Sequence, residues 1–152
     1  MAGLKKMIAF PMLAAFSLLL CPSATAATNA TDEDMMFINY HIHIGNDLPY
    51  DMPPGYPSLN LHCKSSHRDI GFKAMLPGED YTFDTKVDLF ATTRFYCYAE
   101  WLEGKQQYFT AFRARRDEHR CRKYHNACLW SVRDDGIYFS DNNSNWFNTY
   151  PW

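Results

Sequence analysis

Apolar and polar residues alternate in short runs along most of the chain after residue 36. The clearest run is TRFYCYAEW at residues 93–101, where Phe95, Cys97, Ala99 and Trp101 would share one face. Such a period of two is typical of a half-buried β-strand. Similar runs occur at residues 37–44, 59–65, 70–76, 81–86, 107–113, 128–133 and 137–140.

About eight short strands at fairly regular spacing, with no convincing helical period, predict a small antiparallel β-sandwich or barrel. Turn residues separate the strands at PGED (77–80) and DDG (134–136), and a proline-rich loop occupies residues 45–58. The charged segment ARRDEHRCRKYHNA (114–127) is the one place where a short helical turn would be unsurprising. We prefer the sandwich.

Residues 1–26 are interpreted as a signal peptide. Two lysines precede an apolar run at residues 7–20, and ATA at 24–26 has the small-x-small pattern of a signal-peptidase site. Cleavage there leaves residues 27–152 as one exported domain. The apolar run is shorter than the roughly 20 residues of a membrane helix, and no second run approaches that length. We therefore predict no membrane span.

Charge limits the choice of partner. Removing Lys5 and Lys6 reduces the basic residues from 15 to 13, against 17 acidic ones, which gives the mature chain a formal net charge of −4. No basic excess suggests a nucleic-acid partner. Aromatic residues make up 16% of the chain, which suits a β-rich core rather than a disordered chain.

The cysteine count agrees with export. Five cysteines become four once Cys21 leaves with the signal peptide, and the four are Cys63, Cys97, Cys121 and Cys128. An even number in a small secreted chain predicts two disulfides. Four cysteines allow three pairings, and the sequence alone does not choose among them.

The order of several motifs resembles a known family. These motifs are HCKS (62–65), DIG (69–71), FYCYAEW (95–101), a charged segment ending in Cys121, and CLWSVRDDGIYF (128–139). Together they are similar to the plant self-incompatibility S-protein family, over residues 38–139. The chain departs from that pattern at Ile70, where leucine is usual, and in a longer first loop.

The resemblance implies a small secreted β-sandwich with two disulfides. A few members of the family are stigma proteins that inhibit incompatible pollen by engaging a pollen-surface partner. Within this framework the preferred pairing is Cys63 with Cys97, because both lie on apolar faces of alternating strands. Cys121 and Cys128 would then close a local loop over the charged segment.

Two patterns that could support chemistry are disfavoured. His62 and Cys63 could form a base and a thiolate nucleophile, but neighbours on a strand point to opposite faces. His41 and His43 share a strand face and could bind a metal with His62 or Asp84, but no spacing motif supports this. We therefore predict no enzyme activity, no cofactor and no metal site.

The candidate binding residues are Arg115, Arg116 and Arg120, in a stretch with six basic side chains between residues 113 and 123. Such a stretch could steer the protein to an acidic partner surface, and the alternative is a solvated face. If the arginines form a surface, changing all three to serine should weaken binding and leave the fold intact. Asn29 and Asn142 begin glycosylation triplets.

The predicted function is that of a secreted, non-enzymatic recognition protein, a monomer that acts as a ligand for a cell-surface protein receptor. The alternative is a carbohydrate-binding sandwich, because Tyr96, Tyr98 and Trp146 could stack on sugars. If the charged segment is dispensable, the loop from Pro49 to Pro57 becomes the next candidate for partner binding.

Overall fold

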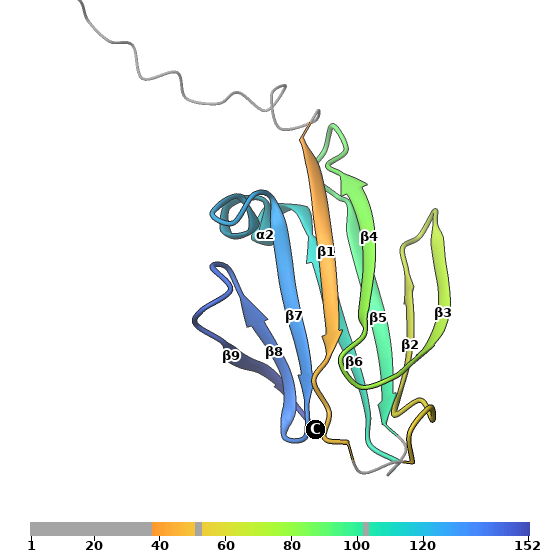
Figure 1. The fold of residues 1–152 in the computed structure, drawn as a ribbon. Helices are drawn as coiled ribbons and strands as arrows, with labels where there is room; N and C mark the ends of the chain where they lie inside the picture. Colours follow the sequence, from red (N-terminus) through yellow and green to blue (C-terminus); the bar gives the residue numbers. More distant parts are fainter. Residues whose placement is uncertain (1–37, 51–52, 102–103) are drawn as a thin grey trace, which may run out of the picture.

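The computed structural model describes residues 38–50, 53–101 and 104–152. The predicted signal peptide and Asn29 lie outside these residues. Nine strands and one helix make up the described part, and Figure 1 shows their arrangement. In chain order they are β1 (Asn39–Asn46), β2 (Leu59–Lys64), β3 (Asp69–Met75), β4 (Asp80–Lys86), β5 (Arg94–Trp101), β6 (Gln106–Arg113), α2 (Ala114–Arg122), β7 (Ala127–Arg133), β8 (Gly136–Ser140) and β9 (Phe147–Pro151).

The strands form two sheets, which confirms the predicted β-sandwich. One sheet has the order β4-β1-β7-β8-β9 and the other the order β3-β2-β5-β6. All neighbours are antiparallel except β1 and β7, which run parallel. Strand β9 was not expected from the sequence, because its residues FNTYP are mostly exposed and do not alternate. Within the described residues, no helix has both the length and the apolar character needed to span a bilayer.

The core lies between the two sheets and follows the predicted alternation. Tyr40, Ile42 and Ile44 of β1 are fully buried, and the inward residues of β5 are nearly so. Trp130 of β7 is buried, and its indole Nε1 donates a hydrogen bond to the carbonyl oxygen of Ala111 on β6 at 2.9 Å. This bond joins one sheet to the other.

Both disulfides that the sequence predicts are present. Cys63 and Cys97 face one another across β2 and β5, with 4.1 Å between their Cα atoms. Cys121 at the end of α2 is joined to Cys128 on β7, with Cα atoms 4.8 Å apart. The first bridge ties two strands of one sheet, and the second ties the helix to the other sheet.

Helix α2 lies at one end of the sandwich, which we call the α2 end. The loop between β4 and β5 at residues 87–93, the turn between β2 and β3 at residues 65–68 and the turn between β8 and β9 at residues 141–146 lie at the same end. The proline-rich loop between β1 and β2 lies at the opposite end (Figure 1). The antiparallel strand order places the charged segment and the 87–93 loop at the same end.

Candidate recognition surface

The charged segment forms an amphipathic helix rather than a solvated loop. Ala114, Asp117, Glu118 and Cys121 are buried, which is the i, i+3, i+4, i+7 spacing of one helix face. No side chain caps the helix at Arg113, but the Asp117 carboxylate accepts a hydrogen bond from the Arg113 backbone N–H at 2.7 Å. The helix is therefore packed through acidic residues as well as through its disulfide.

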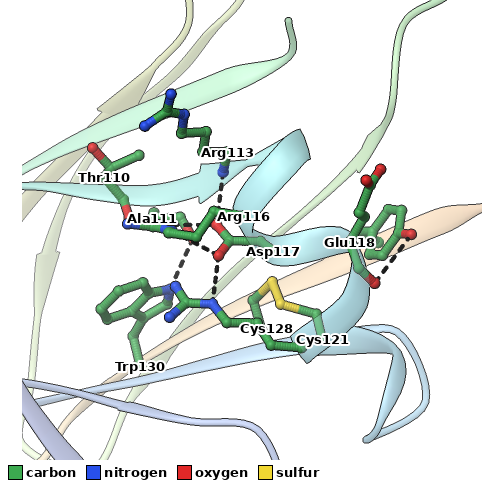
Figure 2. The surroundings of a disulfide bond; sticks show 11 residues. Thr110, Ala111, Arg113, Arg116, Asp117, Glu118, Cys121, Cys128 and Trp130 are labelled. Carbon is green, nitrogen blue, oxygen red and sulfur yellow. Dashed lines mark hydrogen bonds and ion pairs between the residues drawn. A yellow bond between two sulfur atoms is a disulfide. The ribbon is translucent and has the colours of Figure 1, made fainter. Parts of the chain in front are cut away.

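Asp117 is the centre of a buried ion-pair network, as Figure 2 shows. Its carboxylate is fully buried and accepts hydrogen bonds from Arg116 Nε at 2.8 Å and from Arg120 Nε. Arg116 also donates from Nη2 to the carbonyl oxygen of Thr110 on β6 at 2.7 Å. The Arg120 guanidinium lies 3.6 Å from the ring centroid of Phe139 on β8. These contacts hold the helix against both sheets.

The structure therefore corrects the idea that three arginines form one exposed surface. Arg115 is exposed, but the side chains of Arg116 and Arg120 are only 31% and 24% exposed and are paired with Asp117. The expectation that changing all three arginines to serine leaves the fold intact assumed that all three side chains are solvated. That assumption is wrong for Arg116 and Arg120. Removing the two guanidinium groups would leave a buried carboxylate without a counter-charge. Of the three arginines, only Arg115 is fully on the surface.

Beside Arg115, the 87–93 loop presents two large apolar side chains to solvent. Leu89 is 70% exposed and Phe90 is 77% exposed. The loop residues 87–92 and Arg115, together with Glu118, line one open hollow of about 480 Å³. We call Leu89, Phe90 and Arg115 the recognition patch.

The Asp88 carboxylate is hydrogen-bonded to the backbone and side chains of its own loop. Its carboxylate accepts hydrogen bonds from the N–H groups of Phe90 and Thr92, at 2.9 and 3.0 Å, and from the hydroxyl groups of Thr92 and Thr93, at 2.9 and 2.7 Å. Ala91 has the left-handed backbone angle φ = 50°. Desolvation disfavours the charged carboxylate, but these hydrogen bonds outweigh it, and the pKa of Asp88 lies well below its usual value. These bonds brace the backbone on either side of Leu89.

This lowered pKa gives an expected pH dependence. The unfolded chain should bind a proton at Asp88 near pH 4, whereas the folded loop resists it to lower pH. The stability that Asp88 contributes is therefore present above about pH 4 and is lost as the pH falls below it. We expect the unfolding free-energy difference between the wild type and Asp88→Asn to shrink as pH falls from about 5 to 2.

Urea unfolding across a pH series measures this difference, and Asp134→Asn, in an exposed turn, is the matched control. A difference between the wild type and Asp88→Asn that stays constant over this pH range would contradict the assigned role.

The histidines considered as metal ligands are each paired with a different carboxylate. The distances are 2.7 Å from His41 Nδ1 to Asp84, 2.9 Å from His43 Nδ1 to Asp80 and 2.7 Å from His62 Nε2 to Asp69. The hydrogen bond from His41 lowers the pKa of Asp84, and the bond from His62 lowers that of Asp69. In residues 38–50, 53–101 and 104–152, no three of the His, Cys, Asp and Glu side chains gather as metal ligands would.

Of the three sugar-stacking residues considered from the sequence, Trp146 lies apart from Tyr96 and Tyr98. Tyr96 and Tyr98 lie on the outer face of β5, whereas Trp146 lies in the β8–β9 turn, with its ring 5.2 Å from the guanidinium of Arg133. Asn142 is exposed in the same turn, and its side-chain oxygen accepts hydrogen bonds from the backbone N–H groups that follow it.

The proline-rich loop forms a separate apolar hollow at the opposite end of the sandwich. The exposed side chains of Tyr50 and Tyr56, with Leu76 and nearby prolines, line a hollow of about 530 Å³. Residues 51 and 52 of this loop lie outside the described residues. The hollow is far from the recognition patch, because β1 and β4 run between the two ends.

Leu89 and Phe90 were not predicted from the sequence. Alternation of apolar and polar residues indicates strands, and VDLFATT at residues 87–93 does not alternate. The segment does carry a usable signal, since Asp88 precedes Leu89 and Phe90, and Thr92 and Thr93 follow after Ala91. Asp and Thr often bond to nearby backbone groups in turns.

Comparisons with known proteins identify relatives. Residues 41–152 match the family model described as plant self-incompatibility protein S1. S-protein homolog 18 of Arabidopsis thaliana is 35% identical over 96 residues, covering 63% of this chain and 69% of that protein. Self-incompatibility protein S1 of Papaver rhoeas is 35% identical over 85 residues, covering 55% and 59%. S-protein homolog 20 of Arabidopsis thaliana is 33% identical over 90 residues, covering 59% and 64%.

The chain thus spans from about three fifths to just over two thirds of the length of these relatives. No solved structure gives a significant match.

Proposed function

The chain belongs to the plant self-incompatibility protein S1 family, and on that premise we propose that it is a secreted, non-enzymatic signalling protein that binds a cell-surface protein receptor. Membership supports a signalling role like that of the self-incompatibility proteins and confirms the resemblance seen in the sequence. Export would follow cleavage after Ala26, with glycans carried at Asn29 and Asn142.

The observation that supports this function most is the fixed loop of the recognition patch. Leu89 and Phe90 are exposed on a loop whose backbone is held by Asp88, so ordering the loop on binding costs little. A few buried anchors, often aromatic residues or arginine, commonly dominate the binding energy of protein interfaces. The patch therefore has the features of a pre-formed anchor.

Charge at the α2 end suggests the chemistry of the receptor surface. Arg68, Lys86, Arg113 and Arg115 are exposed there. The acids of the same end are mostly engaged, since Asp117 is buried in its ion pairs and Asp88 is bonded to its own loop. We infer a receptor surface with an apolar pocket for Phe90 and an acidic rim for Arg115.

The test compares substitutions in the patch. In Leu89→Ser/Phe90→Ser, loss of two anchors should weaken binding to protoplasts of the source plant by about 30-fold, equivalent to about 2 kcal/mol. In Arg115→Gln the main effect should be a slower association rate and a weaker salt dependence, because this charge lies at the rim. Fluorescently labelled protein collected from medium, beginning at Ala27, gives the binding curves.

Phe147→Ser is the matched control. Phe147 is another exposed aromatic residue, with 61% of its surface accessible, but it lies on β9. Its binding should equal that of the wild type. Equal binding by the patch double variant and this control, with both proteins folded, would exclude the patch as the receptor contact.

A further inference from the structure

A second hollow at the α2 end is lined by positive and hydroxyl-bearing side chains. It has a volume of about 490 Å³ and lies between the β2–β3 turn, the end of β4 and the start of β5. Its cationic residues are Arg68, Lys86 and Arg94, and its hydroxyl residues include Ser65, Ser66, Thr92 and Thr93. Among the described residues that line it, Asp88 is the only acid, and its oxygens already accept four or more hydrogen bonds from the loop.

The three cations retain donors for an anion. Arg68 uses one Nη1 bond, to the backbone oxygen of Asp84 at 2.8 Å, and Arg94 donates from Nη1 to the Tyr96 hydroxyl at 2.7 Å. Throughout the described part of the chain, no carboxylate forms an ion pair with Arg68, Lys86 or Arg94. Guanidinium groups bind carboxylates through paired hydrogen bonds. The hollow is therefore suited to a carboxylate.

Exposed aromatic rings continue from this hollow across the outer face of the β3-β2-β5-β6 sheet. Tyr96 lines the hollow and is 45% exposed, and Tyr98 follows two residues later on the same face of β5. The Tyr98 ring lies 4.7 Å from that of Tyr108 on β6, which is 72% exposed. Across β2, His62 is paired in register with both Tyr98 and the exposed Phe72.

Polar side chains flank this row of rings on both sides. Asn60 and Glu100 lie opposite one another in one neighbouring row, and in the other row Lys64 and Thr110 lie on either side of Tyr96. A protein partner with an apolar surface would need a continuous apolar patch on this sheet face, and the face lacks one. A sugar ring instead offers apolar C–H groups that pack on an aromatic face and hydroxyl groups that bond to a polar surround.

We propose that the hollow and the ring row form one binding site for an acidic polysaccharide. A uronate carboxylate is bound by Arg68, Lys86 and Arg94, and the neighbouring sugar rings stack on Tyr96 and Tyr98. The positive charge of the hollow favours an acidic polysaccharide over a neutral one. This site goes beyond the proposed receptor binding, because it uses neither Leu89, Phe90 nor Arg115.

The test is isothermal titration of the full mature protein with short oligomers of galacturonic acid at low ionic strength. We expect saturable binding that falls at high salt, and a neutral glucose oligomer bound at least about tenfold more weakly. Arg94→Gln and Tyr96→Ala should each weaken binding by about tenfold, through loss of a charged donor and of a stacking face. Lys86→Gln is a second cation variant, in case Arg94→Gln lowers stability.

Phe147→Ala and Lys123→Gln are matched controls, an exposed ring and an exposed cation away from the hollow, and both should bind as the wild type does. The proposal is overturned if the galacturonate oligomer does not bind, or if the Arg94, Lys86 and Tyr96 variants all match these controls. Equal affinity for the neutral oligomer, or competition by sulfate at the affinity of the oligomer, would also overturn it. Because only purified protein and glycan are used, failure here leaves the receptor test unaffected.

Discussion

Replacing Asp117 with asparagine should lower the free energy of unfolding by about 3–5 kcal/mol, the range seen when one member of a buried ion pair is removed. The Asp117 carboxylate is fully buried and accepts hydrogen bonds from Arg116, Arg120 and the Arg113 backbone N–H. An amide keeps the shape but removes the negative charge. Two partly buried guanidinium groups would then repel each other without a counter-ion, and helix α2 should loosen.

Urea unfolding followed by tryptophan fluorescence measures this loss, since the Trp130 ring lies beside Arg120. Asp84→Asn is the matched control, because Asp84 is 59% exposed and pairs with His41 at the surface. Exposed pairs of that kind contribute about 0–1 kcal/mol. A loss in Asp117→Asn no larger than in Asp84→Asn would show that the network does not hold the helix.

Removal of the Cys63–Cys97 bridge is expected to have the second large effect. The two residues are 34 positions apart, and in the chain-entropy model a loop of that length contributes about 4 kcal/mol. The Cys121–Cys128 bridge closes a separation of only 7, which corresponds to about 2 kcal/mol. The pair Cys63→Ala/Cys97→Ala should therefore be destabilised by more than Cys121→Ala/Cys128→Ala.

Equilibrium unfolding of both double variants, with peptide mapping under non-reducing conditions, checks this order. The mapping also tests the pairing chemically, because a Cys63 peptide joined to Cys121 or Cys128 would exclude it. If the 121–128 variant were the less stable one, the short bridge would be acting through the packing of α2 rather than through chain entropy.

Much of the fold could be predicted from alternation alone. The inward residues of β1 and β5 are the ones that the period of two selected, because burial of one sheet face dictates that period. The parallel pairing of β1 with β7 could not be predicted, since alternation reports which face is buried and not which strands are neighbours. Strand β9 was missed for the related reason that an exposed edge strand needs no alternation.

The candidate site was harder to predict because charge in a sequence does not reveal burial. Arg115, Arg116 and Arg120 are chemically alike, yet only Arg115 is exposed. Helical spacing distinguishes them once the segment is known to be helical, since Arg116 and Arg120 flank the buried Asp117 at i−1 and i+3. The resemblance to a family gave the overall architecture but not the roles of individual arginines.

The parallel pairing of β1 also bears on the order in which the chain can fold as it is synthesised. Strand β1 lies between β4 and β7, so its two neighbours come from residues 80–86 and 127–133. The second neighbour emerges from the ribosome some 80 residues after β1, and such distant pairings form slowly. Until β7 is available, one edge of β1 stays unpaired, and an unpaired edge readily pairs with other chains. We therefore expect the open edge of β1 to be a site of aggregation until residues 127–133 have been added to the chain.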